Sequence, residues 1–151
     1  MRHGPAEDTS STGRDADRAL TPSGRERVRD VAHALVKENE SPHAIVTSPL
    51  VRALQTAEIV AAVMKLESVE TTRDIAPGGD AAGFVQRLIS TKRKRVMIVG
   101  HEPDLSSLVF QLAKEHLEML KAMVVGISIR DEGTRLRFVL DPKSVTMNRP
   151  A

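Results

Sequence analysis

The sequence predicts an α/β fold: a three-layer α/β/α sandwich with a mostly parallel central sheet and helices on both faces. Three observations support this class. The chain has 151 residues, a length at which about two thirds of the unfolded surface is buried in one core. Hydrophobic residues make up 40% and charged residues 28%, as in ordinary globular proteins rather than disordered chains. Short β-favouring runs alternate with segments of helical periodicity, which is typical of parallel sheets with crossover helices.

The first predicted helix covers residues 25–39, where apolar positions recur every three to four residues between charged ones. Thr21 and Pro22 mark its start. Thr can cap the free amides of a first turn, and Pro at the first helical position removes an amide that would have no partner. A β-favouring run at 43–47 then predicts a buried strand, and helical spacing at 50–65 predicts the second helix.

The middle of the chain continues this alternation. Residues 67–71 predict a short strand, and an irregular stretch after it ends at Asp80, which can cap a third helix over 81–90. The basic run at 92–95 is interpreted as a solvated turn, because four charges without a companion cluster make a small footprint for nucleic acid. Residues 95–99 have few polar positions and predict a strand buried on both faces.

The last third of the chain predicts a helix over 105–120 and a hairpin of two strands over 124–129 and 136–140. Residues 141–151 are predicted to be a loose tail of one domain that spans 1–151.

The N-terminus breaks the pattern, because only Met1 precedes the polar motif Arg2-His3-Gly4 where a hydrophobic strand is expected. A central strand cannot be built from one residue, so the first strand is expected to be truncated or missing: either the chain begins at an internal Met or upstream residues are absent.

Composition excludes several classes of function. The net charge of +2 gives no field that argues for nucleic acid as a partner. The absence of Cys excludes a disulfide framework, a thiolate nucleophile and a thiolate metal site. With three Phe and no Trp or Tyr, the chain has no set of aromatic side chains on which the bases of single-stranded nucleic acid could stack. The sequence contains no membrane-spanning stretch and no signal segment, so no membrane association and a cytoplasmic location are expected.

Three polar motifs follow predicted strands, at the edge where open parallel sheets bind their ligands. They are Arg2-His3-Gly4, Ser48-Pro49-Leu50-Val51-Arg52 and Gly100-His101-Glu102. Two Arg and two His would therefore meet at one site. Arg binds phosphate oxygens bidentately and stays charged, and His can attack phosphorus or donate a proton near neutral pH. This set of side chains predicts an oxyanion pocket.

The same motifs resemble a known family. Arg2-His3-Gly4, the string from Ser48 to Ala57 (SPLVRALQTA) and Gly100-His101 are similar to the three signatures of the histidine phosphatase (phosphoglycerate mutase-like) superfamily. The short length, the segment 20–24 (LTPSG) and the continuation of Gly100-His101 into Glu102-Pro103-Asp104-Leu105 further resemble the SixA-type phosphohistidine phosphatases.

The resemblance implies roles for four residues. His3 would be the nucleophile, Arg2 and Arg52 would hold the phosphoryl oxygens, and His101 would donate to the phosphoryl group and stabilise the transition state. No metal and no cofactor are implied. Three further histidines have no motif around them and are interpreted as structural or surface residues: His33, His43 and His116.

The substrate is less well defined by the sequence. Many ester-cleaving members of the superfamily use an acid to protonate the leaving alcohol, and here Asp74, Asp80, Glu7 and Asp8 are available without a context that identifies any of them. Imidazole is a better leaving group than an alkoxide. The leading hypothesis is therefore a metal-independent phosphatase that hydrolyses phosphohistidine in a phosphorylated protein, for example a histidine phosphorelay domain. The alternatives are a phosphomonoesterase for a small phosphorylated metabolite and a phosphate-binding regulatory module without turnover.

Overall fold

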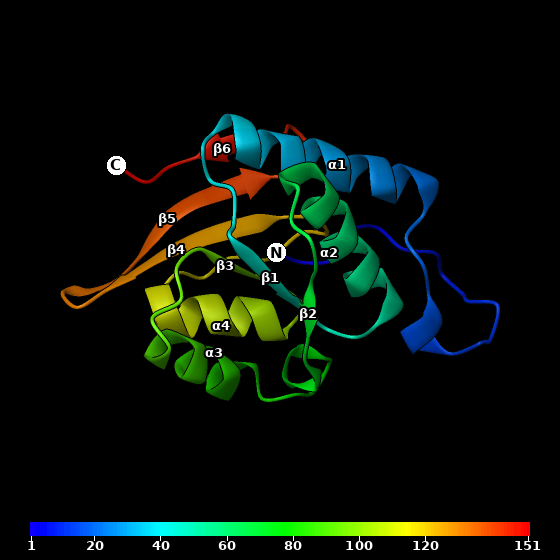
Figure 1. Cartoon of the computed structure of the whole chain (residues 1–151), viewed down its shortest axis with the longest axis horizontal. Coiled ribbons are helices and arrows are strands. Elements are labelled where there is room, and N and C mark those ends of the chain that lie inside the picture. The colour runs from blue at the N-terminus through cyan, green and yellow to red at the C-terminus, as the bar shows by residue number, and fades with distance from the viewer.

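Helices and strands alternate along most of the chain (Figure 1), and the predicted α/β class is confirmed. The computed structural model describes residues 1–151. The helices are α1 (Pro22–Lys37), α2 (Val51–Met64), α3 (Ala81–Ser90) and α4 (Asp104–Ala113), with 3₁₀ turns η1 (Asp15–Asp17) and η2 (Arg73–Ile75). The strands are β1 (Ala44–Thr47), β2 (Glu70–Thr71), β3 (Val96–Val99), β4 (Val124–Arg130), β5 (Gly133–Asp141) and β6 (Thr146–Asn148). None of the helices has both the length and the apolar character required to cross a membrane.

Helices α1 and α3 begin directly after the capping residues that the sequence indicated, Thr21 and Asp80. The Thr21 side chain accepts a hydrogen bond from the amide of Gly24 at 2.9 Å, with Pro22 as the first residue of α1. The Asp80 carboxylate accepts from the amide of Gly83 at 3.0 Å and starts α3. Each cap satisfies an amide that has no partner within its helix.

The strands form two three-stranded sheets. In the first sheet β2, β1 and β3 are parallel and adjacent in this order. In the second, β4, β5 and β6 are antiparallel, and β4 and β5 form the predicted hairpin. Two of the three polar motifs lie directly after β1 and β3, at the C-terminal ends of these strands.

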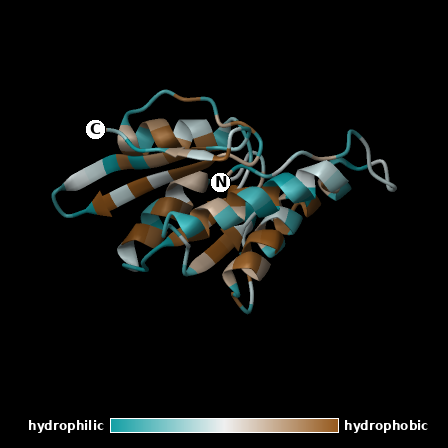
Figure 2. Ribbon diagram, turned by 90° about the horizontal axis from the view of Figure 1, so that it is seen from above, coloured by the Kyte–Doolittle hydropathy of each residue, from teal (hydrophilic) through white to brown (hydrophobic).

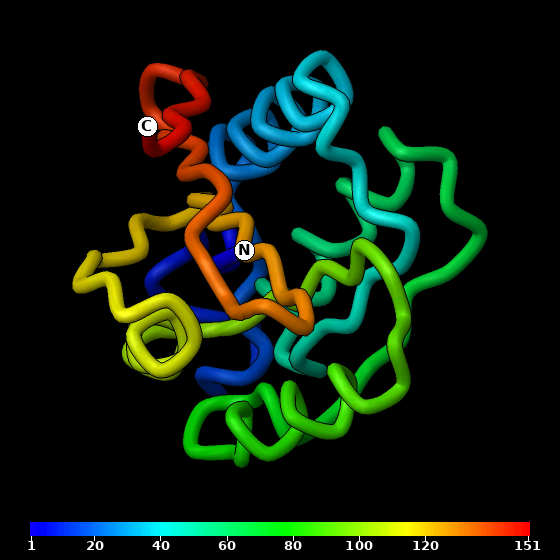
Figure 3. The backbone as a smooth tube through the Cα atoms, turned by 90° about the vertical axis from the view of Figure 1, so that its left-hand side faces the viewer, coloured from blue at the N-terminus to red at the C-terminus, as the bar shows by residue number.

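Residues 1–3 join the two sheets. On one side the amide of His3 donates to the carbonyl of Gly100 (3.1 Å), and the amide of Gly100 donates to the carbonyl of Met1 (3.1 Å). On the other side the amide of Arg2 donates to Met123 O and the amide of Ala122 donates to His3 O, both at 3.0 Å. In Figure 3 the N-terminus accordingly lies near the middle of the molecule. The place of a first strand is thus occupied by these three residues alone.

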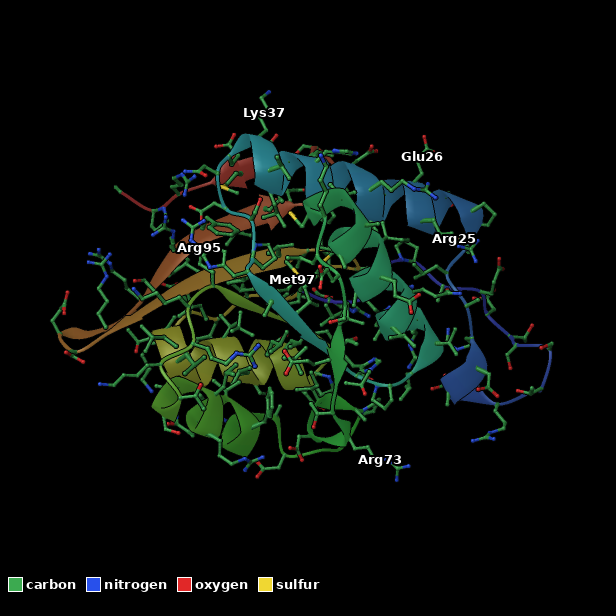
Figure 4. The ribbon with its side chains drawn as sticks, in the orientation of Figure 1. Arg25, Glu26, Lys37, Arg73, Arg95 and Met97 are labelled. Atoms are coloured by element: carbon green, nitrogen blue, oxygen red, sulfur yellow. The ribbon has the colours of Figure 1, made fainter.

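The core has two sides because successive residues of a strand point to opposite faces. Ile45 and Met97 pack with α1 and α2, whereas Val46 and Ile98 face η2, α3 and α4. Figure 1 shows the two pairs of helices on opposite sides of the strands, which gives the predicted three layers. Figure 4 shows Lys37 pointing outward from α1 while Met97 lies inside, and Figure 2 shows the hydrophilic turn of the β4–β5 hairpin.

The helix predicted over 105–120 is wrong after Ala113. Lys114 has a left-handed φ of 59°, and its amide closes the helix on the carbonyl of Phe110 at 2.9 Å. The apolar residues after Ala113 that suggested a longer helix are buried without forming one. Met119 packs under α4 against Leu105 and other members of its cluster.

The tail from residue 141 is not loose as predicted. Residues 146–148 form β6 beside β5. Arg149 and Arg137 both donate to the nearly buried carboxylate of Glu40, at 2.9 and 3.0 Å, and fix the end of the chain to the loop after α1. These contacts join residues about a hundred positions apart, so no local pattern could indicate them.

Candidate active site

Three chain segments bring the predicted residues to one edge of the sheet. His3 follows the segment that lies beside β3, Arg52 is in the first turn of α2 after β1, and His101 comes two residues after β3. The His3 and His101 rings lie 5.2 Å apart between centroids. His3, Arg52 and His101 are only 6%, 5% and 3% exposed. Polar residues are seldom buried together unless they are paired or bind a ligand.

His3 is held in one tautomer by the backbone beside it. Its Nδ1 lies 2.8 Å from the carbonyl oxygen of Gly4. A carbonyl only accepts hydrogen bonds, so Nδ1 carries the proton and Nε2 keeps its lone pair in the neutral ring. The amide of Gly4 in turn donates to Thr56 Oγ1 (3.0 Å), whose hydroxyl donates to the carbonyl of Arg52 (2.7 Å). This chain of bonds fixes the nucleophile candidate against α2.

The two arginines donate hydrogen bonds from terminal guanidinium nitrogens to other parts of the protein. Arg2 donates through one terminal nitrogen to the carbonyl of Met119 at 2.9 Å. Arg52 donates to the backbone carbonyl of Asp15 at 3.0 Å and to its carboxylate at 3.2 Å. Each arginine then has a buried Nε without a hydrogen-bond partner.

His101 has the same arrangement as the arginines. Its Nε2 lies 2.8 Å from the hydroxyl of Ser48, while Nδ1 is buried without a partner. Buried nitrogens without partners are rare in native proteins and require an explanation. All three such side-chain nitrogens of the chain belong to residues that the sequence assigned to one oxyanion pocket: Arg2, Arg52 and His101.

Burial keeps both histidines neutral. Burial lowers the pKa of His3 to about 4, with further lowering by the positive charges of Arg52, Arg2 and Lys121, and the bond to Gly4 opposes the shift. The pKa of His101 is lowered to about 3, first by burial and then by His3 and Arg52. A neutral His3 has a lone pair for attack on phosphorus, and a neutral His101 still has one N–H to donate.

We expect His3 to remain neutral in mildly acidic solution. Its ring nitrogens, followed by NMR from about pH 8 to about pH 3, should titrate near 4 rather than near the ordinary value of 6.5. Between pH 6.5 and about pH 4, His3 is protonated in the unfolded chain but stays neutral in the folded chain. Acidification through this range therefore lowers the free energy of unfolding. A midpoint at or above 6.5 in the folded protein would contradict the proposed desolvation of His3.

Sequence reasoning missed Asp15. Its carboxylate binds Arg52 and also accepts from Nε of Arg18 at 2.8 Å, although its side chain is 65% exposed. These contacts, with Arg18 the largest contribution, hold the pKa of Asp15 below its usual value. Asp15 lies in η1, far from Arg52 along the chain, and nothing in the local sequence indicates the pairing.

The four carboxylates considered as a general acid have other contacts or are exposed. Asp74 accepts from Arg87 at 2.9 Å, and Asp80 caps α3. Glu7 and Asp8 are exposed. The three histidines outside the motifs are also exposed, as interpreted from the sequence: His33, His43 and His116. The chain contains no group of three or more His, Cys, Asp or Glu side chains that could hold a metal ion.

Comparison with known proteins identifies the class. Residues 1–78 match the model of the histidine phosphatase superfamily (branch 1). The chain is 32% identical over 157 aligned positions to an uncharacterized protein of Picosynechococcus sp., which covers 99% of this chain and 94% of that protein. The chain therefore belongs to the histidine phosphatase superfamily, and it is a phosphatase.

Two further relatives identify the type within the superfamily. The chain is 30% identical over 116 residues to phosphohistidine phosphatase SixA of Escherichia coli, covering 74% of this chain and 71% of that protein. The fold matches the structure of protein histidine phosphatase SixA in complex with tungstate with a TM-score of 0.87, at 24% identity and 97% coverage of both chains. The chain is of the SixA type.

Proposed function

We propose that this phosphatase hydrolyses phosphohistidine in a protein by a metal-independent reaction with His3 as the nucleophile. Nε2 of His3 attacks phosphorus, the P–N bond of the substrate breaks, and the leaving imidazole nitrogen takes a proton from solvent. Water then attacks the phosphoryl group on His3, which releases inorganic phosphate and restores Nε2.

The observation that carries this proposal is that three buried nitrogens without partners all belong to the residues near His3, namely Arg2, Arg52 and His101. Arg2 Nε, Arg52 Nε and His101 Nδ1 have no partner, although at least one other nitrogen of each side chain is bonded to the protein. Phosphoryl transfer spreads negative charge over three equatorial oxygens and is accelerated mainly by positioned donors. Three fixed donors beside a neutral imidazole supply what the reaction requires.

The carboxylates support phosphohistidine over a phosphate ester. An alkoxide leaving group needs a proton from a positioned acid, whereas an imidazole leaves readily. Asp74 and Asp80, the two acids expected near this edge, are bonded to Arg87 and to the first turn of α3. The SixA of E. coli, to which this chain is 30% identical, is named as a phosphohistidine phosphatase.

The connections beside the site favour a protein substrate, and we propose a phosphorylated protein such as a histidine phosphorelay domain as the partner. Residues 48–50 and 100–103, which link β1 to α2 and β3 to α4, are too short to form a lid over a small molecule. The longer segment before α1 is already bonded to Arg52 through Asp15. A site without a lid can accept a phosphoryl group carried by another protein.

We expect Asp74→Asn and Asp80→Asn each to retain activity on a phosphohistidine protein within about threefold. Asn at position 80 still caps α3, so the fold is preserved. Initial rates on phosphohistidine and on a phosphate monoester should be compared for both variants. If either change removes most of the activity on phosphohistidine, the enzyme uses a carboxylic acid. That result would favour a phosphate monoester as the substrate.

The rate should be unchanged by excess EDTA, and vanadate and tungstate should inhibit it competitively, because they mimic the phosphoryl group. The inhibition is expected because the proposal assigns the nitrogens of Arg2, Arg52 and His101 to the oxygens of the phosphoryl group. Steady-state rates with and without chelator are the measurement. A requirement for zinc or manganese would contradict the metal-independent reaction.

A further inference from the structure

We infer that Ser48 is a positioning residue that fixes the tautomer of His101 so that its Nδ1–H points to the phosphoryl group. This inference rests on the proposed function and adds to it a residue that makes no contact with substrate of its own. Ser48 lies directly after β1, and its hydroxyl oxygen is 2.8 Å from His101 Nε2.

The hydrogen-bond inventory of Ser48 decides the direction of that bond. The amide of Leu50 donates to Ser48 Oγ at 3.2 Å, so Oγ already accepts one bond. Ser48 is completely buried, at 0% exposure, and its single O–H must find an acceptor inside the protein. The acceptor in contact with Oγ is His101 Nε2. The hydroxyl therefore donates to Nε2.

A nitrogen that accepts a hydrogen bond has no proton in the neutral ring. His101 then carries its proton on Nδ1, the atom that is buried without a partner. In the opposite tautomer two groups would be unsatisfied. The Ser48 O–H would have no acceptor, and the Nδ1 lone pair would face the negative oxygens of the phosphoryl group.

The two histidines are thus set in complementary forms. The carbonyl of Gly4 draws the proton of His3 to Nδ1 and leaves a lone pair on Nε2 for attack. The hydroxyl of Ser48 places the proton of His101 on Nδ1 as a donor. With the rings 5.2 Å apart, one neutral imidazole is the nucleophile and the other is a hydrogen-bond donor.

The test compares Ser48→Ala with Thr47→Val. Thr47 is the matched control, because its hydroxyl is also completely buried at the end of β1 but donates to the carbonyl of Ser48 rather than to a histidine. In ¹⁵N-histidine-labelled protein at neutral pH, we expect the Nδ1–H tautomer of His101 in the wild type and in Thr47→Val. Ser48→Ala should shift the ring toward a mixture of tautomers.

Activity gives the second readout. Loss of the hydrogen-bond partner that orients a metal-binding histidine lowers activity by about 10-fold to 100-fold. We expect kcat of Ser48→Ala to fall by roughly the same factor, with a smaller change in KM. Thr47→Val should stay within about threefold of the wild type.

Three results would overturn the inference: an Nε2–H tautomer of His101 in the wild type, a tautomer unchanged by Ser48→Ala, or an equal loss of activity in Thr47→Val. The tautomer is read on the resting protein without substrate. A failure of the proposed function, seen as no phosphoryl group on His3, is therefore distinguishable from a failure of this inference.

Discussion

His3→Ala is expected to lower turnover by about 10⁴-fold or more, the scale seen when a covalent nucleophile is removed. The reason is geometric. The side chain lies at the edge of the sheet, its Nε2 keeps the lone pair, and its ring lies 5.2 Å from that of His101. The backbone bonds of residue 3 to Gly100 and Ala122 do not depend on the imidazole, so the fold should persist. The variant should still bind tungstate weakly through the arginines.

The measurement is the rate on a phosphohistidine protein together with mass analysis for a phosphoryl group on the enzyme. His33→Ala is the matched control, because His33 is exposed on α1 and lies outside the motifs. Circular dichroism of both variants checks the fold. Activity of His3→Ala within a few fold of the wild type would remove His3 from the mechanism.

Arg52→Lys should be the second most damaging of the changes considered, although it keeps the charge. Arg52 binds Asp15 with two nitrogens and keeps Nε free at the site. A lysine ammonium cannot occupy both places, since it is a single point of charge on a flexible stem. The loss expected in transition-state stabilisation is about 2 to 4 kcal/mol, comparable with removing one oxyanion donor, or roughly 30-fold to 10³-fold in kcat/KM.

Arg29→Lys provides the control, because Arg29 is exposed on α1 and the same chemical change there touches no part of the site. Steady-state kinetics on both variants separate the two effects. Unchanged kcat/KM in Arg52→Lys would place Arg52 outside the pocket.

The sequence alone could predict the parts of this molecule that are encoded locally. The Thr21 and Asp80 caps mark the starts of α1 and α3 because a cap acts within one turn. The side chains of the candidate site could also be predicted, because parallel strands end at one edge and carry the motif residues with them. His3, Arg52 and His101 are accordingly found together.

The parts that the sequence could not predict depend on contacts across the fold. Helix α4 ends at Lys114, where no glycine or proline in the sequence marks the end. Arg149 is held by Glu40, which lies on a loop far away along the chain. Asp15 binds Arg52 from a loop that has no motif of its own. The direction of the hydrogen bond between Ser48 and His101 follows from all the polar neighbours of the Ser48 hydroxyl, which are known only in the folded chain.

The contact between Asp15 and Arg52 has a consequence for the end of the catalytic cycle. The product is free phosphate, and every turnover requires its departure. Asp15 already accepts from both terminal nitrogens of Arg52, from one through its carboxylate and from the other through its backbone carbonyl. Fewer N–H groups of Arg52 are therefore left for a departing anion. We therefore expect Asp15 to weaken the binding of phosphate at this site and to favour its release.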